Sequence, residues 1–125
     1  MNLGVLDTSV VIALVQGKPV AMPDAGAVSI VTLCELHHGV LAADDAQRPA
    51  RLEALMLAET EFRAFPLDAR VIPHYGRIMS AARREGRRPG INDVLIAATA
   101  AGRGLPVYTR DRDFLGLDGV GVVLA

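Results

Sequence analysis

Cysteine is almost missing from this chain of 125 residues, since Cys34 is the only one. A single cysteine excludes an intrachain disulfide and a zinc site built from several thiolates. We expect Cys34 to be a small core residue, because cysteine is among the most frequently buried residue types. No apolar run approaches the ~20 residues that cross a bilayer, and the N-terminal MNLGVLD has no basic segment typical of a signal peptide. These absences predict a soluble, cytoplasmic protein with no membrane partner.

Aromatic residues are also scarce, at 4% of the sequence, and the net charge is only -1. Few side chains are therefore available for stacking on nucleic-acid bases, and the balanced charge gives no bulk attraction to nucleic acid. The charge is unevenly distributed, however. Residues 1–62 carry eight acids and three bases, whereas residues 63–125 carry six acids and ten bases, all of them arginine. Any binding of nucleic acid must therefore come from a local basic surface.

Apolar residues make up 51% of the sequence, enough to build a core for one domain covering residues 1–125. Short β-rich runs alternate with helical patterns along the whole chain. Strands are predicted at residues 3–6, 27–31, 63–67, 105–109 and 120–124, and helices at 10–17, 32–43, 47–61, 68–84 and 93–102. This alternation implies right-handed βαβ units. The predicted fold is a three-layer α/β/α sandwich with a mainly parallel sheet of about five strands.

Three of these helices begin at residues that suit a helix N-terminus. Thr32 and Glu35 have the spacing of a capping box, in which the two side chains accept hydrogen bonds from the first backbone amides. Asp68 is expected to open the helix that follows it. Asn92 is expected to cap the helix that begins at Asp93.

Four acids follow predicted strands or lie near the starts of predicted helices. Asp7 directly follows the first strand and Asp111 follows the fourth strand by two residues, while Glu35 and Asp93 lie in the first turns of two helices. In open parallel sheets, ligands bind beyond the carboxyl ends of the strands, where the strand order reverses. If the first and fourth strands are neighbours at that point, the four carboxylates converge from separate segments.

Carboxylates gathered in this way would raise one another's pKa values unless a cation neutralised them. Mg2+ and Mn2+ prefer oxygen ligands and retain bound water, and such an ion can activate a water and stabilise charge on a phosphoryl oxygen. The absence of histidine and cysteine from the set argues against zinc. Each acid alone also has a simple explanation as a cap or turn residue, so only their joint placement favours a metal site.

Four segments make the sequence resemble the PIN-domain family, in particular the VapC toxins of bacterial toxin–antitoxin pairs. They are LDTS at 6–9, SIVTLCELHHGVL at 29–41, INDVLIAATA at 91–100 and YTRDRDF at 108–114, and the resemblance extends from Leu3 to Leu124. It implies a PIN-like fold and an Mg2+- or Mn2+-dependent endoribonuclease acting on structured RNA such as tRNA. It also implies a homodimer held inactive by a cognate antitoxin protein.

The resemblance assigns the family's acidic site to four positions of this sequence. Asp7, Asp93 and Asp111 are expected to hold the metal ion, and Glu35 is expected to help bind it or to orient the attacking water. Asp113 is an accessory residue. Its carboxylate could extend the metal shell, orient a water or pair with a neighbouring arginine.

Hydroxyl side chains lie beside these acids in the sequence. Thr8, Ser9 and Thr109 are candidate donors of hydrogen bonds to the carboxylates, because acids that bind metals are normally hydrogen-bonded themselves. Phe114 is expected to be a core anchor that fixes the turn carrying Asp111.

Four arginines, Arg83, Arg84, Arg87 and Arg88, precede the predicted helix that carries Asp93. They could contact RNA phosphates and bring RNA to an otherwise repulsive acidic pocket. Such contacts would supply affinity and little sequence choice. The alternative is a solvated helix end, where cations interact favourably with the helix dipole.

Two other classes of function compete with a nuclease. One is a catalytically inactive PIN-like adaptor that binds RNA or protein, with its acids engaged in surface ion pairs. The other is a different α/β phosphate enzyme. A phosphatase of the haloacid-dehalogenase type would need an acid where this chain has Ser9, and a phospho-receiver would need a lysine after a late strand, whereas Lys18 is the only lysine. The sequence therefore disfavours this second class.

Overall fold

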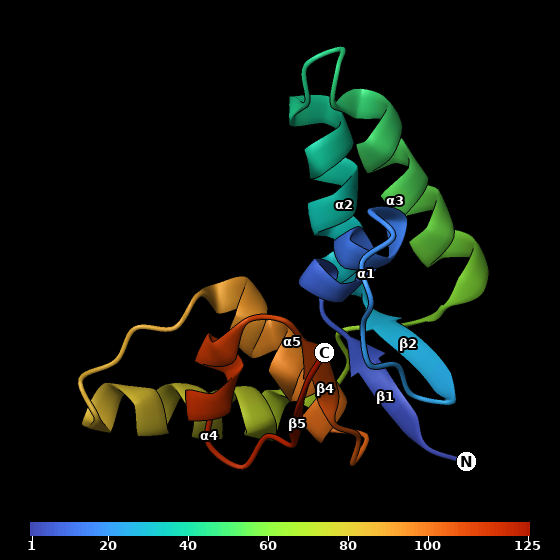
Figure 1. Cartoon of the computed structure of the whole chain (residues 1–125). Coiled ribbons are helices and arrows are strands. Elements are labelled where there is room, and N and C mark those ends of the chain that lie inside the picture. The colour runs from blue at the N-terminus through green and yellow to red at the C-terminus, as the bar shows by residue number, and fades with distance from the viewer.

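A parallel sheet of five strands forms the centre of the protein, seen in a computed structural model that describes all of residues 1–125 (Figure 1). The strands are β1 (Leu3–Leu6), β2 (Ala25–Ser29), β3 (Arg63–Phe65), β4 (Val107–Thr109) and β5 (Val122–Leu124). They lie in the order β3-β2-β1-β4-β5, and every neighbouring pair is parallel. The helices are α1 (Thr8–Val15), α2 (Ile30–Ala42), α3 (Arg48–Glu61), α4 (Val71–Arg84), α5 (Ile91–Ala101) and the 3-10 helix η1 (Arg112–Gly116).

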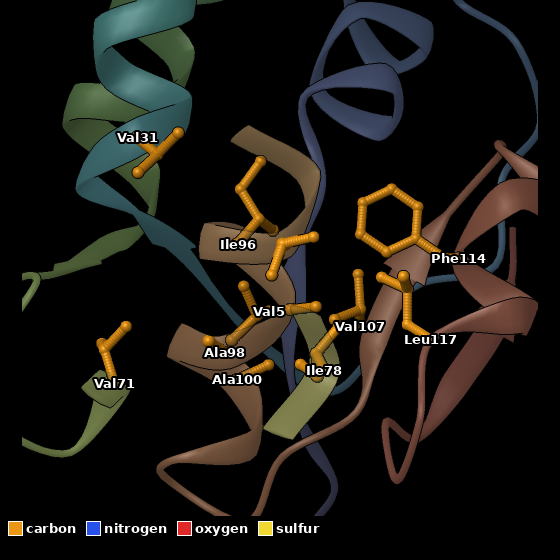
Figure 2. Close-up of a cluster of buried hydrophobic side chains, with 12 residues drawn as sticks. Val5, Val31, Val71, Ile78, Ile96, Ala98, Ala100, Val107, Phe114 and Leu117 are labelled. Atoms are coloured by element: carbon orange, nitrogen blue, oxygen red, sulfur yellow. The ribbon is translucent and has the colours of Figure 1, made fainter. Parts of the chain in front are cut away.

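Helices cover both faces of the sheet. Successive strand residues point to opposite sides, and the apolar residues on each side pack against helices. Val5 and Val107 belong to a core cluster with apolar side chains of α4, α5 and η1 (Figure 2). Their neighbours Leu6 and Tyr108 belong to a second cluster with side chains of α1, α2 and α3. The predicted three-layer α/β/α fold with a parallel sheet of five strands is therefore confirmed. None of the helices combines the length and the apolar character that spanning a membrane requires.

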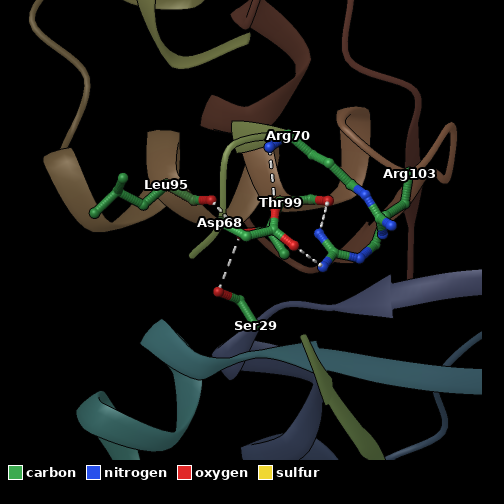
Figure 3. A network of polar contacts seen from close by, with 6 residues as sticks. All are labelled: Ser29, Asp68, Arg70, Leu95, Thr99 and Arg103. Atoms are coloured by element: carbon green, nitrogen blue, oxygen red, sulfur yellow. Dashed lines mark hydrogen bonds and ion pairs between the residues drawn. The ribbon is translucent and has the colours of Figure 1, made fainter. Parts of the chain in front are cut away.

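Helix α5 is the most deeply buried helix of the fold, with Val94, Ile96 and Thr99 fully inaccessible to solvent. Polar contacts fix its position along the sheet (Figure 3). The Thr99 hydroxyl lies 3.2 Å from the hydroxyl of Ser29 at the end of β2, and Arg103, just beyond the helix, donates to Asp68 at 3.2 Å. These contacts determine where the other end of α5 emerges at the edge of the sheet.

Two helix starts differ from the sequence prediction. Helix α2 begins at Ile30 because Ser29 caps it, with the Ser29 hydroxyl accepting from the amide of Val31 at 3.1 Å. The predicted capping box is therefore wrong: Thr32 lies buried inside the helix, and the Glu35 side chain is free for other contacts. Helix α5 begins after Gly90 without a side-chain cap, so Asn92 lies within its first turn and does not cap it.

Asp68 and Cys34 also differ from expectation. Helix α4 begins at Val71, because the Asp68 carboxylate accepts from the amide of Arg70 in the preceding turn and from Arg103. Cys34 is exposed and not in the core. Successive residues of a helix point about 100° apart, and packing turns Val31 and Leu36 inward, which leaves Cys34 on the outer side of α2.

Phe114 is the core anchor that the sequence predicted, with 1% of its side chain exposed, whereas its neighbour Leu115 is 51% exposed. Replacing Phe114 by alanine leaves a cavity beneath η1, and we expect Phe114→Ala to lower the free energy of unfolding by about 3–5 kcal/mol. The matched exposed change Leu115→Ala should alter it by less than about 0.5 kcal/mol. Urea unfolding of the two variants measures this difference, and equal effects would contradict the packing described.

Candidate active site

The strand order reverses between β1 and β4, which are hydrogen-bonded neighbours. From β1 the chain passes to β2 on one side, and β4 later pairs with β1 on the other side. Asp7 directly follows β1, and its amide donates to the carbonyl of Tyr108 in β4 at 2.9 Å. Asp111 follows β4 by two residues. The expected pairing of the first and fourth strands is confirmed, and it creates a binding crevice of the kind found at such reversals.

Asp7 is a buried carboxylate, only 5% exposed, and it accepts three hydrogen bonds. Its Oδ1 atom accepts from the amide of Thr8 at 2.7 Å. Its Oδ2 atom accepts from the hydroxyls of Ser9 and Thr109, both at 2.8 Å. These donors compensate for the lost hydration of the charge and hold the carboxylate in one orientation. The expected hydrogen bonds from Ser9 and Thr109 are therefore present.

Thr8 connects Asp7 with Glu35. Its amide donates to Asp7, and its hydroxyl donates to Oε1 of Glu35 at 2.7 Å. The same hydroxyl lies 3.2 Å from the hydroxyl of the buried Thr32. One residue at the start of α1 thus fixes two acids that are 28 positions apart in the sequence.

Asp111 and Asp113 lie where β4 passes into η1. The hydroxyl of Thr109 accepts from the amide of Asp111 at 3.0 Å, and Oδ1 of Asp111 accepts from the amide of Asp113 at 2.9 Å. Asp111 therefore caps η1, a helix that the sequence analysis took for a turn. Asp113 is exposed, and its carboxylate pairs with neither Arg110 nor Arg112.

Asp93 faces the other acids from the first turn of α5. Its pKa is raised from the ordinary value of 3.8 to about 6, chiefly because burial disfavours the charged form. The negative charges of Asp7, Asp111, Glu35 and Asp113 raise it further, in that order. The structure therefore brings together all five acids that the sequence singled out. Asp93 accepts no hydrogen bond from any group of the chain, unlike Asp7 and Glu35.

The acids do not form a closed cage, since no three acidic, histidine or cysteine side chains are arranged to hold one metal ion together. This arrangement fits Mg2+ or Mn2+, because Mg2+ usually keeps several waters and takes only one or two carboxylates directly. The donor set is oxygen only, which suits hard ions. The carboxylate of Asp93, with a raised pKa and no internal donor, is the group whose charge most needs a cation.

Two cavities adjoin the acids. A cavity of about 390 Å³ is lined by Asp93 and Asp113, together with Arg87 and Arg88 of the α4–α5 loop and Arg112 of η1. Arg83 and Arg84 lie in the exposed last turn of α4 and do not line this cavity. The position of Arg112 in this cavity was not predicted from the sequence, although its place between Asp111 and Asp113 was a usable signal.

The second cavity, of about 1050 Å³, lies between α1, α2 and α3. Glu35 and Thr8 line it beside Asn92, and the exposed Cys34 is also part of its wall. About half of the lining residues are hydrophobic, so the acids lie between a mixed cavity and a strongly charged one.

In metal-free buffer we expect Asp93 to titrate near pH 6, and Asp111→Asn to lower this pKa by removing a like charge. The exposed control Asp45→Asn should leave it unchanged. Because the folded state holds this proton more tightly than the unfolded chain, stability without metal should fall as the pH rises from about 4 to about 6. Carboxyl NMR measures the titration, and a pKa near 3.8 would mean that the acids do not share one site.

The sequence pattern of the PIN domain matches residues 4–120. Among curated proteins, the chain is 45% identical over 127 aligned residues to Ribonuclease VapC5 of Mycobacterium tuberculosis. This alignment covers 96% of this chain and 91% of that protein. It is 31% identical over 118 residues to the tRNA(fMet)-specific endonuclease VapC of Shigella flexneri, and that alignment covers 87% of each of the two chains.

Solved structures give the same result. The VapBC-5 structure of Mycobacterium tuberculosis, described as a member of the VapBC family of toxin–antitoxin systems, matches with a TM-score of 0.88 and 39% identity over 100% of both chains. FitAcB of Neisseria gonorrhoeae matches with a TM-score of 0.68 and 29% identity, covering 98% of this chain and 96% of that one. The chain therefore belongs to the PIN-domain family, and within it to the VapC proteins.

Proposed function

We propose that this chain is a metal-dependent endoribonuclease that hydrolyses phosphodiester bonds of structured RNA such as tRNA. The observation that carries the proposal is the environment of the Asp93 carboxylate. It accepts no hydrogen bond from the chain, and the negative charges of four other acids act on it. A divalent cation relieves that repulsion and provides the chemistry of RNA hydrolysis. The names of the relatives, a ribonuclease VapC5 and a tRNA(fMet)-specific endonuclease, support RNA as the substrate.

Asp7, Asp93 and Asp111 would hold the ion, Mg2+ or Mn2+, with one or two of them as direct ligands and the rest through its bound waters. When bound, the ion supplies a water of lowered pKa and a positive charge beside the phosphoryl oxygen. Asp7 is the rigid member, because three hydrogen bonds fix its carboxylate. Asp93 is the adaptable member, since no hydrogen bond restrains it.

Glu35 reaches the crevice from α2 and lines the larger cavity. Its hydrogen bond from Thr8 leaves the second carboxylate oxygen free to bind the ion or to accept a proton from the attacking water. Asp113 is exposed at the rim, where it adds negative charge and contributes an accessory ligand or a contact to bound water.

An inactive adaptor fits the structure less well. In an adaptor, acids at this edge would be neutralised by surface ion pairs. The ion pairs of the chain involve Asp45, Asp68, Glu85 and Asp118, and none of them involves an acid of the crevice. The carboxylates are thus kept unpaired at a cost in repulsion, which is expected for a cation site.

A cognate antitoxin is the proposed regulator, as the related structures include toxin–antitoxin complexes. An arginine of that partner could enter the acidic crevice and form a charge-assisted hydrogen bond with a carboxylate. We also propose a cytoplasmic homodimer. Exposed apolar side chains such as Leu41, Met56 and Ile72, which are 70%, 56% and 69% exposed, are available for such contacts.

Asp93→Asn is the sharpest test of the activity, because the replaced carboxylate accepts no hydrogen bond within the chain. We expect RNA cleavage to fall on the order of 100-fold or more, since a loss at a metal ligand should exceed the 10–100-fold effect of its supporting residues. Thermal unfolding should show an intact fold. Asp7→Asn should also abolish cleavage, but it is the less specific test. Its new amide would face the hydroxyls of Ser9 and Thr109, which both donate to the Asp7 carboxylate.

Asp45→Asn is the matched control, because it removes an exposed carboxylate outside the crevice. Cleavage by this variant should equal that of the wild type, and a chelator should stop both. Undiminished cleavage of tRNA by Asp93→Asn, or by the wild type in metal-free buffer, would contradict the proposed function.

A further inference from the structure

We propose that Arg88 and Arg112 form a phosphate-binding subsite that holds an RNA phosphate next to the one cleaved at the acidic crevice. This inference rests on the proposed function and specifies how that site captures its substrate. The two side chains come from different segments, the α4–α5 loop and η1, and line one cavity of about 390 Å³.

The third arginine of this cavity, Arg87, is already engaged. It donates two hydrogen bonds to Glu85, one of them at 2.9 Å and the other shorter. It also packs against η1 at Gly116, where an added Cβ would lie 2.7 Å from Nη1 of Arg87. Arg87 therefore joins the α4–α5 loop to η1 and holds the two walls of the cavity together.

Arg88 and Arg112, by contrast, have no partner within the chain. Neither guanidinium takes part in an ion pair. Neither donates a side-chain hydrogen bond, whereas Arg84 donates to Ser80 and Arg110 to the carbonyl of Pro19. Both residues are exposed. Two free guanidiniums in one cavity provide up to ten N–H donors, in a planar geometry that matches phosphate oxygens.

The charge balance of the crevice explains why such a subsite is needed. Five carboxylates act on the site, so one divalent ion leaves a net charge of about -3 that repels the RNA backbone. Arg88 and Arg112 line one cavity with Asp93 and Asp113, whereas Glu35 lines the other cavity. A phosphate bound there would meet positive charge while its neighbour in the RNA reaches the acids.

Binding of bulk bacterial tRNA tests this assignment. The measurement uses the full chain carrying Glu35→Gln, which weakens cleavage and lies outside the arginine cavity, in magnesium buffer at several salt concentrations. Adding Arg88→Gln and Arg112→Gln should weaken binding on the order of 10-fold and flatten the slope of log affinity against log salt by about 0.7–0.9, the value for one lost phosphate contact.

The matched control is Arg63→Gln with Arg70→Gln, which removes the same charge. These two arginines line a different cavity, with Gly102 and Arg103 beyond the far end of α5. That end, Ala101, lies about 12 Å along the helix from Asp93, further than the ~10 Å Debye length at 0.1 M salt. In the same Glu35→Gln background, we expect the control to keep the slope of its parent, and urea unfolding should show that both sets of arginine substitutions leave the chain folded.

Equal slopes and affinities for the two double variants would overturn the phosphate subsite. If the wild type still cleaved tRNA and Asp93→Asn did not, the proposed function would stand without it. If the wild type neither bound nor cleaved tRNA, the proposed function would fail, and the subsite would fail with it. In a wild-type background, the Arg88→Gln and Arg112→Gln pair should raise KM far more than it lowers kcat, because it removes a contact to a phosphate that does not react.

Discussion

Repulsion among carboxylates at the reversal of strand order is the interaction on which the rest of the structure depends. The fold gathers five acids from four separate segments of the chain and neutralises none of them with an ion pair. Hydrogen bonds relieve part of the repulsion at Asp7, Glu35 and Asp111. Burial and the repulsion that remains together raise the pKa of Asp93 to about 6. We propose that a crevice held in this state binds a cation, because binding would remove an unfavourable energy that the folded chain already contains.

The apolar core makes this arrangement possible by fixing the elements that carry the acids. Helix α5 is almost wholly buried between the sheet and α4, and the Ser29–Thr99 contact sets its position along the sheet. Asp93 thus projects from a rigid support. Phe114 does the same for η1, whose cap is Asp111. Burial stabilises the helices, and the stability of the helices holds like charges close to one another.

Much of the fold could be predicted from the sequence, because hydrophobic periodicity and the position of acids after strands are local signals. The alternation of β-rich and helical segments indicated the parallel sheet, and the acids at strand ends indicated the crevice. The start of α2 could not be predicted, because Ser29 and Thr32 both suit a cap and the end of β2 selects Ser29. The exposure of Cys34 depends on how packing rotates α2, and that information lies in distant segments. The cavity shared by Arg88 and Arg112 likewise requires η1 to lie against the α4–α5 loop.

Proton release on metal binding tests the central claim most directly. If the acids form one unit that a cation neutralises, Mn2+ must displace the proton that repulsion and burial hold on Asp93. Calorimetric titration at pH 6 in two buffers of different ionisation enthalpy should give one specific site and the release of about half a proton per ion, and at pH 8 almost none. Binding without proton release at pH 6, or no specific binding at either pH, would contradict the account.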